Sequence, residues 1–438
     1  MQPDQHVGLN RKVARNLLPL LVTGYIIAFI DRQNVSFAKL QMVDDLGLTE
    51  AAFGLGASLF FIGYLIFEVP SNLILIRVGP RRWLARIMVT WGLVTVLLAY
   101  TPNSAVFYVL RFLLGVAEAG FYPGLLYLLT RWFPAAYRGR MISYFVLGSV
   151  VANMISGPLS GYLLAASGIL GLRGWQWIFL STGLPAIVVA VLILRFLPDR
   201  PEDARFLSAE ERAHLLQTLA AERAAMPPSH PNPLRSLLDL RVLALTGLFM
   251  LFTLSAYGFS YWLPTVVKSF GVGDQTNGLL NVIPWLCVGL ALYWVQRRPG
   301  RVGDTFVSIV VPSLLGAVCF LASYYLPAAP MRFIALCAAA MCIFMAQPCF
   351  WTLPGRFLSG AGAAAAIAGI NSIGNLGGFL GQTFVPLIRD LTGSVAAPLL
   401  LLAACLLCRG LLALAVVQWI FARTVVGANR AAAQSHSD

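Results

Sequence analysis

The sequence predicts an all-α membrane protein in which twelve transmembrane helices form two pseudo-symmetric six-helix halves. Three observations lead to this fold class: a shortage of charge, a series of long apolar runs, and one long polar connection near the middle. Of the 438 residues, 58% are hydrophobic and 11% are charged, and the mean hydropathy is +0.77. Soluble chains carry about a quarter charged residues. The composition therefore excludes a series of soluble domains, a disordered chain and a disulfide scaffold.

Long apolar runs supply the transmembrane helices. A run of about 18 to 25 apolar residues is long enough to cross the roughly 30 Å of hydrocarbon in a bilayer. No segment shows the regular alternation that a membrane β-barrel needs. The predicted spans are 17–38, 51–76, 83–101, 105–129, 141–168, 175–197, 243–268, 277–295, 305–326, 332–354, 363–388 and 396–421.

The long polar connection follows the sixth span and divides the chain. We predict an N-terminal six-helix half over residues 1–198, a linker over 199–240 and a C-terminal six-helix half over 241–438. The segment VGPRR (78–82), after the second span, resembles RPGR (298–301), after the eighth. This weak internal echo favours two related halves, each built from inverted triplets of helices.

The linker begins with a helical pattern. Ser208 and Glu211 have the spacing of a capping box, and three leucines between 215 and 219 form one apolar stripe. We expect a short amphipathic helix on the cytoplasmic face. An extended tether with four prolines between 227 and 233 should follow it.

Basic residues predict the orientation of the chain. The net charge of +13 comes from arginines in short gaps between apolar runs. It therefore indicates topology rather than nucleic-acid binding, which needs a soluble basic face. Because cytoplasmic gaps are rich in Lys and Arg, both termini and the linker are predicted to be cytoplasmic, in a protein of the cell inner membrane. The groups that set this orientation are Arg11, Lys12 and Arg15; Arg77, Arg81, Arg82 and Arg86; Arg131, Arg138 and Arg140; and Arg297, Arg298 and Arg301, whereas the alternate gaps hold only Lys39, Arg173, Lys268, Arg332 and Arg389.

Ionisable groups inside the spans mark a candidate site. An ionised group is costly in a bilayer, so each one is a hypothesis of function. Asp31 and Arg32 lie in the first span, and Arg111 and Glu118 lie in the fourth. At about 1.5 Å per residue, Asp31, Arg32 and Arg111 fall on one level, with Glu118 about 10 Å deeper on the face of Arg111. Tyr64, in the second span, falls close to the level of Glu118.

These groups suit an anionic substrate and a proton. Arginine stays charged and its fork of donors matches a carboxylate, so Arg32 and Arg111 can hold an anion where water is excluded. Asp31 and Glu118 can titrate, because burial raises the pKa of a carboxyl group and a neighbouring arginine lowers it. The alternative is a closed set of ion pairs that only holds helices together.

Two further charged positions have separate interpretations. Glu68 lies on the second span, next to a loop that contains Arg77, Arg81 and Arg82. We interpret these four residues as a gating or structural set, with substrate contact by Glu68 as the alternative. Arg409, the ionisable residue left inside the spans of the second half, is given no role.

The second half offers neutral polar groups instead. Trp351 lies in the tenth span, and Asn371 and Asn375 lie one turn apart in the eleventh. The two amides are candidates for binding substrate hydroxyls, and hydrogen bonds between helices are the equal alternative for either one. Glycine pairs at 374/378 and 377/381 allow close helix packing.

Several motifs are absent from the sequence. The chain has no phosphate-binding G-x-x-x-x-G-K-[ST] segment and no G-x-S-x-G nucleophile elbow. All four histidines lie outside the predicted spans. We therefore expect no enzymatic activity, no metal site and no cofactor, with the proton as coupling ion carried by carboxylates.

The motifs as a set resemble the anion:cation symporter family of the major facilitator superfamily. The likeness covers nearly the whole chain and is nearest to the bacterial tartrate, phthalate and sugar-acid permeases. It is carried by FIDRQNVS (29–36), FIGY (61–64), PSN (70–72), RFLLGVAEAG (111–120), WFP (132–134), WLP (262–264), FWTLP (350–354) and NSIGNLGG (371–378).

The resemblance implies roles for particular residues. Arg32 would bind the substrate carboxylate, and Tyr64, Trp351 and Asn371 would line the site. Asp31 and Glu118 would take the coupling protons, with Arg111 setting their pKa values. Two departures are visible. The loop after the second span has Asn72 and Ile76 where the superfamily usually has a glycine and an acid, and some relatives have a tyrosine in place of Phe29.

The predicted function is proton-coupled import of a small organic anion by alternating access, in a bacterial monomer. A tartrate-like dicarboxylate is the first choice of substrate, followed by a sugar acid and then an aromatic carboxylate. One alternative is a proton-driven exporter of organic anions or drugs, because the same site chemistry fits that direction. An alternative from another class is a membrane sensor that does not transport.

Overall fold

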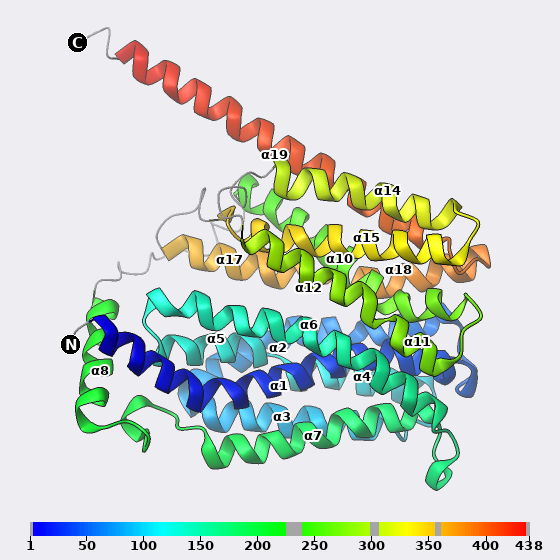
Figure 1. Cartoon of the computed structure of the whole chain (residues 1–438), viewed down its shortest axis with the longest axis horizontal. Coiled ribbons are helices and arrows are strands. Elements are labelled where there is room, and N and C mark those ends of the chain that lie inside the picture. The colour runs from blue at the N-terminus through cyan, green and yellow to red at the C-terminus, as the bar shows by residue number, and fades with distance from the viewer. Residues whose placement is uncertain (1–2, 225–238, 298–305, 355–360, 435–438) are drawn as a thin grey trace. The chain divides into compact units, whose positions relative to one another are not determined.

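The computed structural model describes residues 3–224, 239–297, 306–354 and 361–434, and every regular element within these ranges is helical (Figure 1). The RPGR segment and the proline-rich tether lie outside the described residues. The helices are α1 (Pro3–Asp45), α2 (Glu50–Val78), α3 (Pro80–Leu98), α4 (Ser104–Glu118), α5 (Phe121–Trp132), α6 (Ala135–Ala165), η1 (Ile169–Gly171), α7 (Gly174–Phe196), η2 (Pro201–Asp203), α8 (Ala209–Ala224), α10 (Leu240–Lys268), α11 (Asp274–Leu280), α12 (Val282–Gln296), η3 (Phe306–Val310), α14 (Val311–Tyr325), α15 (Ala329–Phe350), α17 (Ala361–Gly374), α18 (Leu376–Thr392) and α19 (Pro398–Gln434).

Helices occupy all twelve predicted spans. Within the described ranges, ten helical stretches are long and apolar enough to cross a membrane. The other two predicted spans correspond to α3 and to the pair α17 and α18. Helix α3 carries Arg81, Arg82 and Arg86 near its start, and the break at Asn375 leaves two shorter helices.

Three predicted spans are broken helices with polar or glycine residues at the break. Helix α4 ends at Glu118, and α5 begins after Gly120, whose φ of 87° is a left-handed conformation that glycine adopts without strain. Asn281 separates α11 from α12, and Asn375 separates α17 from α18. A helix break inside a membrane protein must be buried in protein or line a binding site or cavity, because the freed backbone groups need polar partners.

The chain folds as two compact units. Unit 1 contains residues 1–228, 260–286 and 382–393, and unit 2 contains 229–259, 287–381 and 394–438. Unit 1 therefore includes the last part of α10, all of α11 and the last part of α18, together with α1 to α8.

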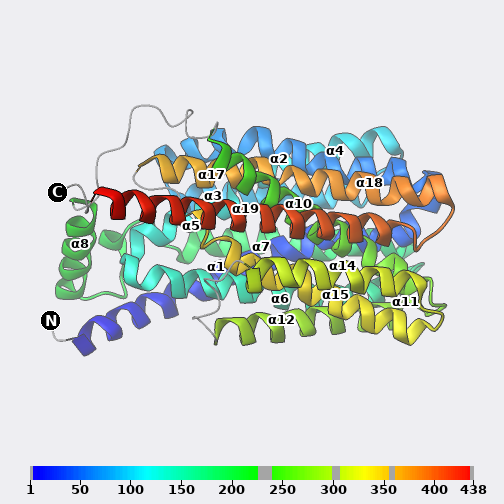
Figure 2. The same cartoon turned by 90° about the horizontal axis from the view of Figure 1, so that it is seen from above.

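Unit 1 is a bundle of long helices that run side by side (Figures 1 and 2). Helix α1 packs on α6 and α7, α3 packs on α4 and α7, and α2 packs on α4. The α2–α4 contact is close because Gly63 and Gly115 lie in it: a Cβ atom at either would overlap a carbonyl oxygen of the other helix. This contact holds the polar residues of α2 and α4 together.

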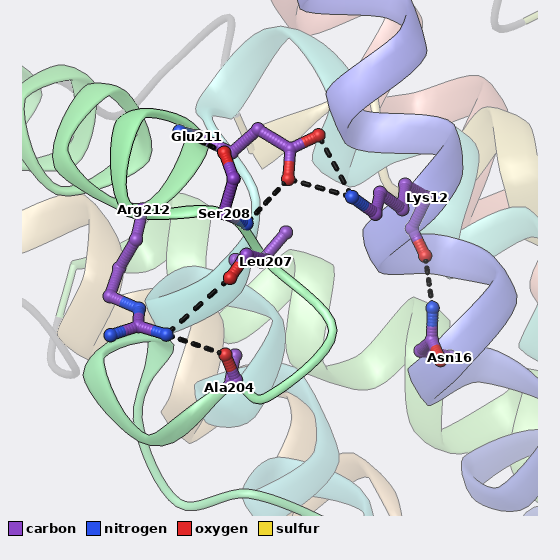
Figure 3. A network of polar contacts seen from close by, with 7 residues as sticks. All are labelled: Lys12, Asn16, Ala204, Leu207, Ser208, Glu211 and Arg212. Atoms are coloured by element: carbon purple, nitrogen blue, oxygen red, sulfur yellow. Dashed lines mark hydrogen bonds and ion pairs between the residues drawn. The ribbon is translucent and has the colours of Figure 1, made fainter.

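Helix α8 is the predicted linker helix, and its capping box is confirmed. The Ser208 hydroxyl accepts a hydrogen bond from the Glu211 backbone N–H (3.1 Å), and Oε2 of Glu211 accepts one from the Ser208 N–H (2.8 Å). The same Oε2 lies 2.7 Å from Nζ of Lys12 on α1 (Figure 3), and this hydrogen bond lowers the pKa of Glu211. Leu215 and Leu219 are buried, as the apolar stripe predicts.

A second ion pair attaches the other end of α8. Glu222 lies 2.6 Å from Nη2 of Arg138 on α6, and its Oε2 accepts a hydrogen bond from the backbone N–H of Ala135 at 3.0 Å. Helix α8 thus lies across one end of the unit 1 bundle, tied to α1 and α6 (Figures 1 and 2).

Unit 2 packs α14 against α15 and α19. The glycines of α17 and α18 contact α10: Cβ atoms at Gly374, Gly377 and Gly381 would overlap atoms of α10. The Thr253 hydroxyl on α10 also donates a hydrogen bond to the Gly374 carbonyl (2.5 Å). The close packing predicted from these glycines is therefore present.

Candidate functional site

A buried ion pair joins α1 to the end of α4. Nη2 of Arg32 lies 2.5 Å from Oε1 of Glu118, and Nε of Arg32 donates to the same oxygen at 2.7 Å. The Glu118 side chain is 1% exposed and that of Arg32 is 17% exposed. The second carboxylate oxygen, Oε2, is buried and has no hydrogen-bond partner among the described residues. Glu118 therefore keeps one oxygen available to a proton.

The break between α4 and α5 places Glu118. Ala119 leaves the helical conformation with ψ at 130°, and Gly120 adopts a left-handed conformation before α5 continues the same span. A side chain at Gly120 would also overlap the hydroxyl of Ser71 on α2. Glu118 is consequently the last residue of its helix, held against α2 and facing Arg32.

Aromatic rings surround the Arg32 guanidinium. Its central carbon, Cζ, lies 5.6 Å from the ring centroid of Phe29, 5.4 Å from that of Phe60 and 5.3 Å from that of Tyr64. Cation–π attraction is strongest where water is removed, so these rings stabilise the charge and limit its movement. Tyr64, predicted as a lining residue, thus contacts Arg32.

Arg111 has unused hydrogen-bonding capacity. Its side chain is buried and its Nη2 donates to the Ala57 carbonyl of α2 at 2.8 Å. Its Nε and Nη1 have no hydrogen-bond partner in the part of the chain that the structure describes. The Phe60 ring lies 5.4 Å from Cζ of Arg111, the same separation as from Arg32. One ring thus contacts both arginines.

Asp31 has neutral partners. The buried carboxylate accepts hydrogen bonds from the Asn34 amide (3.0 Å) and from the Thr95 hydroxyl of α3 (3.2 Å). Successive residues on a helix point about 100° apart, so Asp31 and Arg32 face different neighbours. None of the ion pairs among the described residues includes Asp31.

The predicted residues of the second half lie in unit 2. The Trp351 ring is partly buried, 4.9 Å from the ring centroid of Phe249 and 5.2 Å from that of Phe350. Asn371 and Asn375 are also partly buried, and the Asn375 backbone N–H donates to the Asn371 carbonyl at 3.0 Å. Asn375 thus marks the break after α17. That these residues share one site with Arg32 remains a prediction.

The predicted gating residues differ in their surroundings. Glu68 is buried on α2, one turn from Tyr64, whereas Arg77 and Arg82 are exposed. The Arg81 guanidinium donates to the Leu194 carbonyl of α7 (2.9 Å), and its backbone N–H donates to Asp199 (2.9 Å). Arg81 therefore fixes the α2–α3 turn to the end of α7, and a gating role for this set remains a prediction.

Two buried cations lie outside the candidate site. Lys39 is predicted to lie in a gap between spans, but α1 continues to Asp45 and the side chain of Lys39 is 1% exposed. Arg409, which received no role, is buried in unit 2 and donates to the Ser313 hydroxyl (2.8 Å) and to two carbonyl groups of α15. The continuing apolar residues Phe37, Ala38 and Met42 were the available signal for Lys39.

No metal site is visible in the described ranges: they contain no group of three or more His, Cys, Asp and Glu residues that could hold an ion. The candidate site in unit 1 consists of two arginines, two carboxylates and a tyrosine: Arg32, Arg111, Asp31, Glu118 and Tyr64. Such a set can exchange anions and protons.

Comparison with known proteins identifies the family. Residues 21–382 match the Major Facilitator Superfamily. The chain is 46% identical to a quinolone resistance transporter of Acinetobacter baumannii over 91% of this chain and 92% of that one, and 40% identical to a putative tartrate transporter of Agrobacterium vitis over 97% of each. The crystal structure of a D-xylose–proton symporter has the same fold, with a TM-score of 0.70, 17% identity and coverage of 91% of this chain and 96% of that one. The chain therefore belongs to the Major Facilitator Superfamily, and it is a multi-pass membrane transporter of a small molecule rather than an enzyme.

Proposed function

We propose that this transporter imports a small organic anion together with protons. The observation that carries the proposal is the buried Arg32–Glu118 pair, beside an Arg111 with two donors that have no hydrogen-bond partner among the described residues. A structural ion pair would be expected to fill its hydrogen-bonding positions. Here one buried carboxylate oxygen and two buried guanidinium nitrogens have no hydrogen-bond partner in the described part of the chain, which suits groups that exchange partners.

The exchange follows from charge balance. Glu118 and a substrate carboxylate compete for the same guanidinium fork on Arg32. A proton on Glu118 removes its charge, so Arg32 becomes available to the substrate without leaving an unpaired charge in the membrane. Substrate and proton therefore bind with positive coupling, and by linkage each raises the affinity for the other. No cofactor is needed, and the proton is the coupling ion.

Asp31 is the second proposed coupling group. It lies on α1 beside Arg32, and the charges of both Glu118 and Arg111 act on it. Its hydrogen bonds come from an amide and a hydroxyl, which also tolerate a protonated carboxyl group. A proton can therefore be held there without rearranging α1.

The proposed orientation places both termini in the cytoplasm of a bacterial cell, with the protein in the inner membrane as a monomer. The arginine-rich turn between α2 and α3 and the linker helix α8 would then face the cytoplasm. Transport proceeds by rocking of the two halves about a central site. Trp351, Asn371 and Asn375 would recognise the remainder of the substrate from the second half.

A tartrate-like dicarboxylate is the proposed substrate, with a sugar acid close behind and an aromatic carboxylate third. The putative tartrate transporter at 40% identity supports the first choice. Two arginines in contact with one ring, Phe60, offer a separate cation for each carboxylate. The amides of Asn371 and Asn375 suit hydroxyl groups.

Proton-driven export is the second candidate function. The relative at 46% identity bears the name of a quinolone resistance transporter, which supports outward transport of a drug. Quinolones carry a carboxylate, so the same arginines would suit them. Direction therefore has to be measured.

The test uses purified protein in liposomes. Tartrate, an aldonate, an aldarate, an aromatic carboxylate and a quinolone are each offered with an inward proton gradient and after collapse of the gradient by a protonophore. We expect one organic acid to accumulate only with the gradient, and protein-free liposomes serve as the control. Uptake that is unchanged by the protonophore would contradict proton coupling. Accumulation of the quinolone alone, driven by an oppositely directed proton gradient, would favour the exporter.

A further inference from the structure

Lys39 is a buried cation near the C-terminal end of α1. Its Nζ lies 2.9 Å from Oε2 of Glu50, the first residue of α2. Nζ also lies 3.8 Å from the ring centroid of Trp262 and 5.0 Å from that of Tyr261. A lysine is almost never fully buried unless it is paired. Here a carboxylate and two aromatic rings together replace its water.

The partners of Lys39 come from different halves of the sequence. Glu50 belongs to the first half, whereas Tyr261 and Trp262 lie on the part of α10 that folds with unit 1. Both rings are 1% exposed, so they exclude water from the ammonium group. Two aromatic residues of the 260–286 segment thus shield the Lys39 ammonium group of the first half from water.

Tyr261 also connects this cluster with the candidate site. Its hydroxyl is buried and has no hydrogen-bond partner within the described ranges. The charges of both Glu50 and Arg111 act on it. Tyr261 therefore contacts Lys39 through its ring and interacts electrostatically with Arg111 of the candidate site.

A second contact closes the beginning of α2. The first N–H groups of a helix have no partner within the helix, and a carboxylate stabilises that end. The side chain of Asp390, in the last turn of α18, supplies one: its Oδ2 accepts a hydrogen bond from the Ala51 N–H at 2.7 Å. A residue of the second half thus caps a helix of the first.

The α2–α18 contact continues along one face. A Cβ atom at Gly54 would overlap both the Pro386 ring and the Gln382 carbonyl oxygen, so α18 lies directly against the α2 backbone there. One turn further, the Thr383 hydroxyl donates to the Ser58 hydroxyl at 2.9 Å. Helices α6 and α11 make a similar contact, in which Gly157 packs on Gly278.

We propose that these contacts are the closed outer gate of the transporter, with Lys39 as a charged plug and Asp390 as its latch. The proposal rests on the orientation and alternating access given above. Opening to the outside would require the ends of α10, α11 and α18 to leave the first half. That movement would expose Lys39 and the beginning of α2 to water, where both are well solvated. In the closed state these polar groups bind one another, and in the open state water takes the place of each partner. Both the closed and the open state are therefore stable.

The test measures gate opening without any substrate. A cysteine at Ser58 lies under the α2–α18 contact, and its reaction with a membrane-impermeant thiosulfonate from outside intact cells reports opening. Labelling is counted above that of the parent protein, whose seven native cysteines remain. Asp390→Asn and the paired change Lys39→Met with Glu50→Gln, which leaves no buried charge unmatched, are introduced into this reporter. Asp44→Asn, an exposed carboxylate at the same end of α1, is the matched control.

We expect slow labelling in the reporter and the control, and labelling about tenfold faster in both gate variants, because each loses part of the free energy that holds the gate closed. Equal rates in all four proteins would overturn the proposal, and so would labelling from the cytoplasmic side alone in inverted vesicles. A gate variant that fails to elute as a single folded species is replaced by Trp262→Leu, for which the same acceleration is expected.

The two proposals can fail separately. Faster labelling in the gate variants together with substrate uptake that ignores the proton gradient would leave the gate and remove proton coupling. Unchanged labelling together with gradient-driven uptake would support proton coupling and exclude the gate.

Discussion

Replacing Glu118 with glutamine tests the coupling mechanism directly. The amide keeps the shape of the side chain, so Oε1 can still accept from both Arg32 nitrogens, at 2.5 and 2.7 Å. It removes the negative charge and cannot release a proton. Glu118→Gln therefore resembles the protonated state of the transporter permanently.

The magnitude follows from the two hydrogen bonds. The substitution removes the carboxylate charge from each bond while the charge of Arg32 stays, and a charge on one partner adds about 1 kcal/mol to a hydrogen bond, so the two bonds lose about 2 kcal/mol. The same 2 kcal/mol no longer opposes a substrate carboxylate that competes for Arg32. Since about 1.4 kcal/mol is a factor of ten, the affinity for the organic anion at neutral pH should rise by roughly ten- to thirtyfold.

The assay combines binding with two modes of transport. A titration in detergent gives the affinity, and substrate exchange across liposomes without a gradient should survive. Accumulation driven by a proton gradient should be lost. The melting temperature without substrate should fall, because Arg32 loses its counter-charge, and saturating substrate should restore it. Glu202→Gln, which changes an exposed carboxylate outside the membrane helices, is the matched control and should behave as the unmodified protein.

Either of two results would refute this reasoning. A Glu118→Gln protein that still concentrates its substrate with a proton gradient would exclude Glu118 as a proton carrier. An affinity that falls by a factor of ten would show that Glu118 helps to hold the substrate instead of competing with it.

Three further predictions follow from the same contacts. Arg32→Lys keeps the charge but loses the planar fork, so binding should weaken about tenfold or more, and an unchanged titration would remove Arg32 from the site. Binding to the unmodified protein should tighten as pH falls, because substrate and proton are coupled positively, and Asp31→Asn should flatten this pH slope; equal slopes would make Asp31 a structural residue. Docking of α8 through Glu211 should persist above the ordinary glutamate pKa and be lost as pH falls through the lowered pKa of Glu211. Glu211→Gln should therefore speed tryptic cleavage after Arg212 at pH 7, and equal cleavage rates would show that the Lys12 pair does not hold α8.

Most of the helical fold could be predicted because it depends on composition. A segment that crosses a bilayer satisfies its backbone hydrogen bonds as a helix or as a strand of a closed barrel, and the apolar runs lack the alternation of a barrel strand. The capping box at Ser208 and the close contact at Gly377 depend on local spacing and residue size, and the structure contains both. Helix breaks were less visible, since Gly120 and Asn375 are short interruptions within otherwise apolar segments.

The partner of Arg32 shows where depth arithmetic stops. Counting residues placed Arg32 on a level with Arg111 and left Glu118 two turns deeper, yet Glu118 is the residue that Arg32 pairs with. Depth along a helix axis locates a Cα atom, whereas an arginine side chain reaches across more than one turn. The break after Glu118, which turns its carboxylate toward α1, depends on a backbone conformation that no periodicity describes.

Arg32 and Lys39 show what the sequence left out about α1. They lie seven residues apart, two turns along one face of a continuous helix and about 10 Å apart along its axis. Each pairs with a glutamate at the end of another helix: Arg32 with Glu118, and Lys39 with Glu50. Aromatic rings also cover both cations and exclude water from them. Each cation therefore depends on a carboxylate or another anion, and not on water, for its counter-charge. An anion that enters from the outside through the proposed gate would meet the cation of Lys39 first and that of Arg32 next. A single face of α1 would then provide both the plug of the gate and the binding group of the site, so opening the one exposes a path of positive charge to the other.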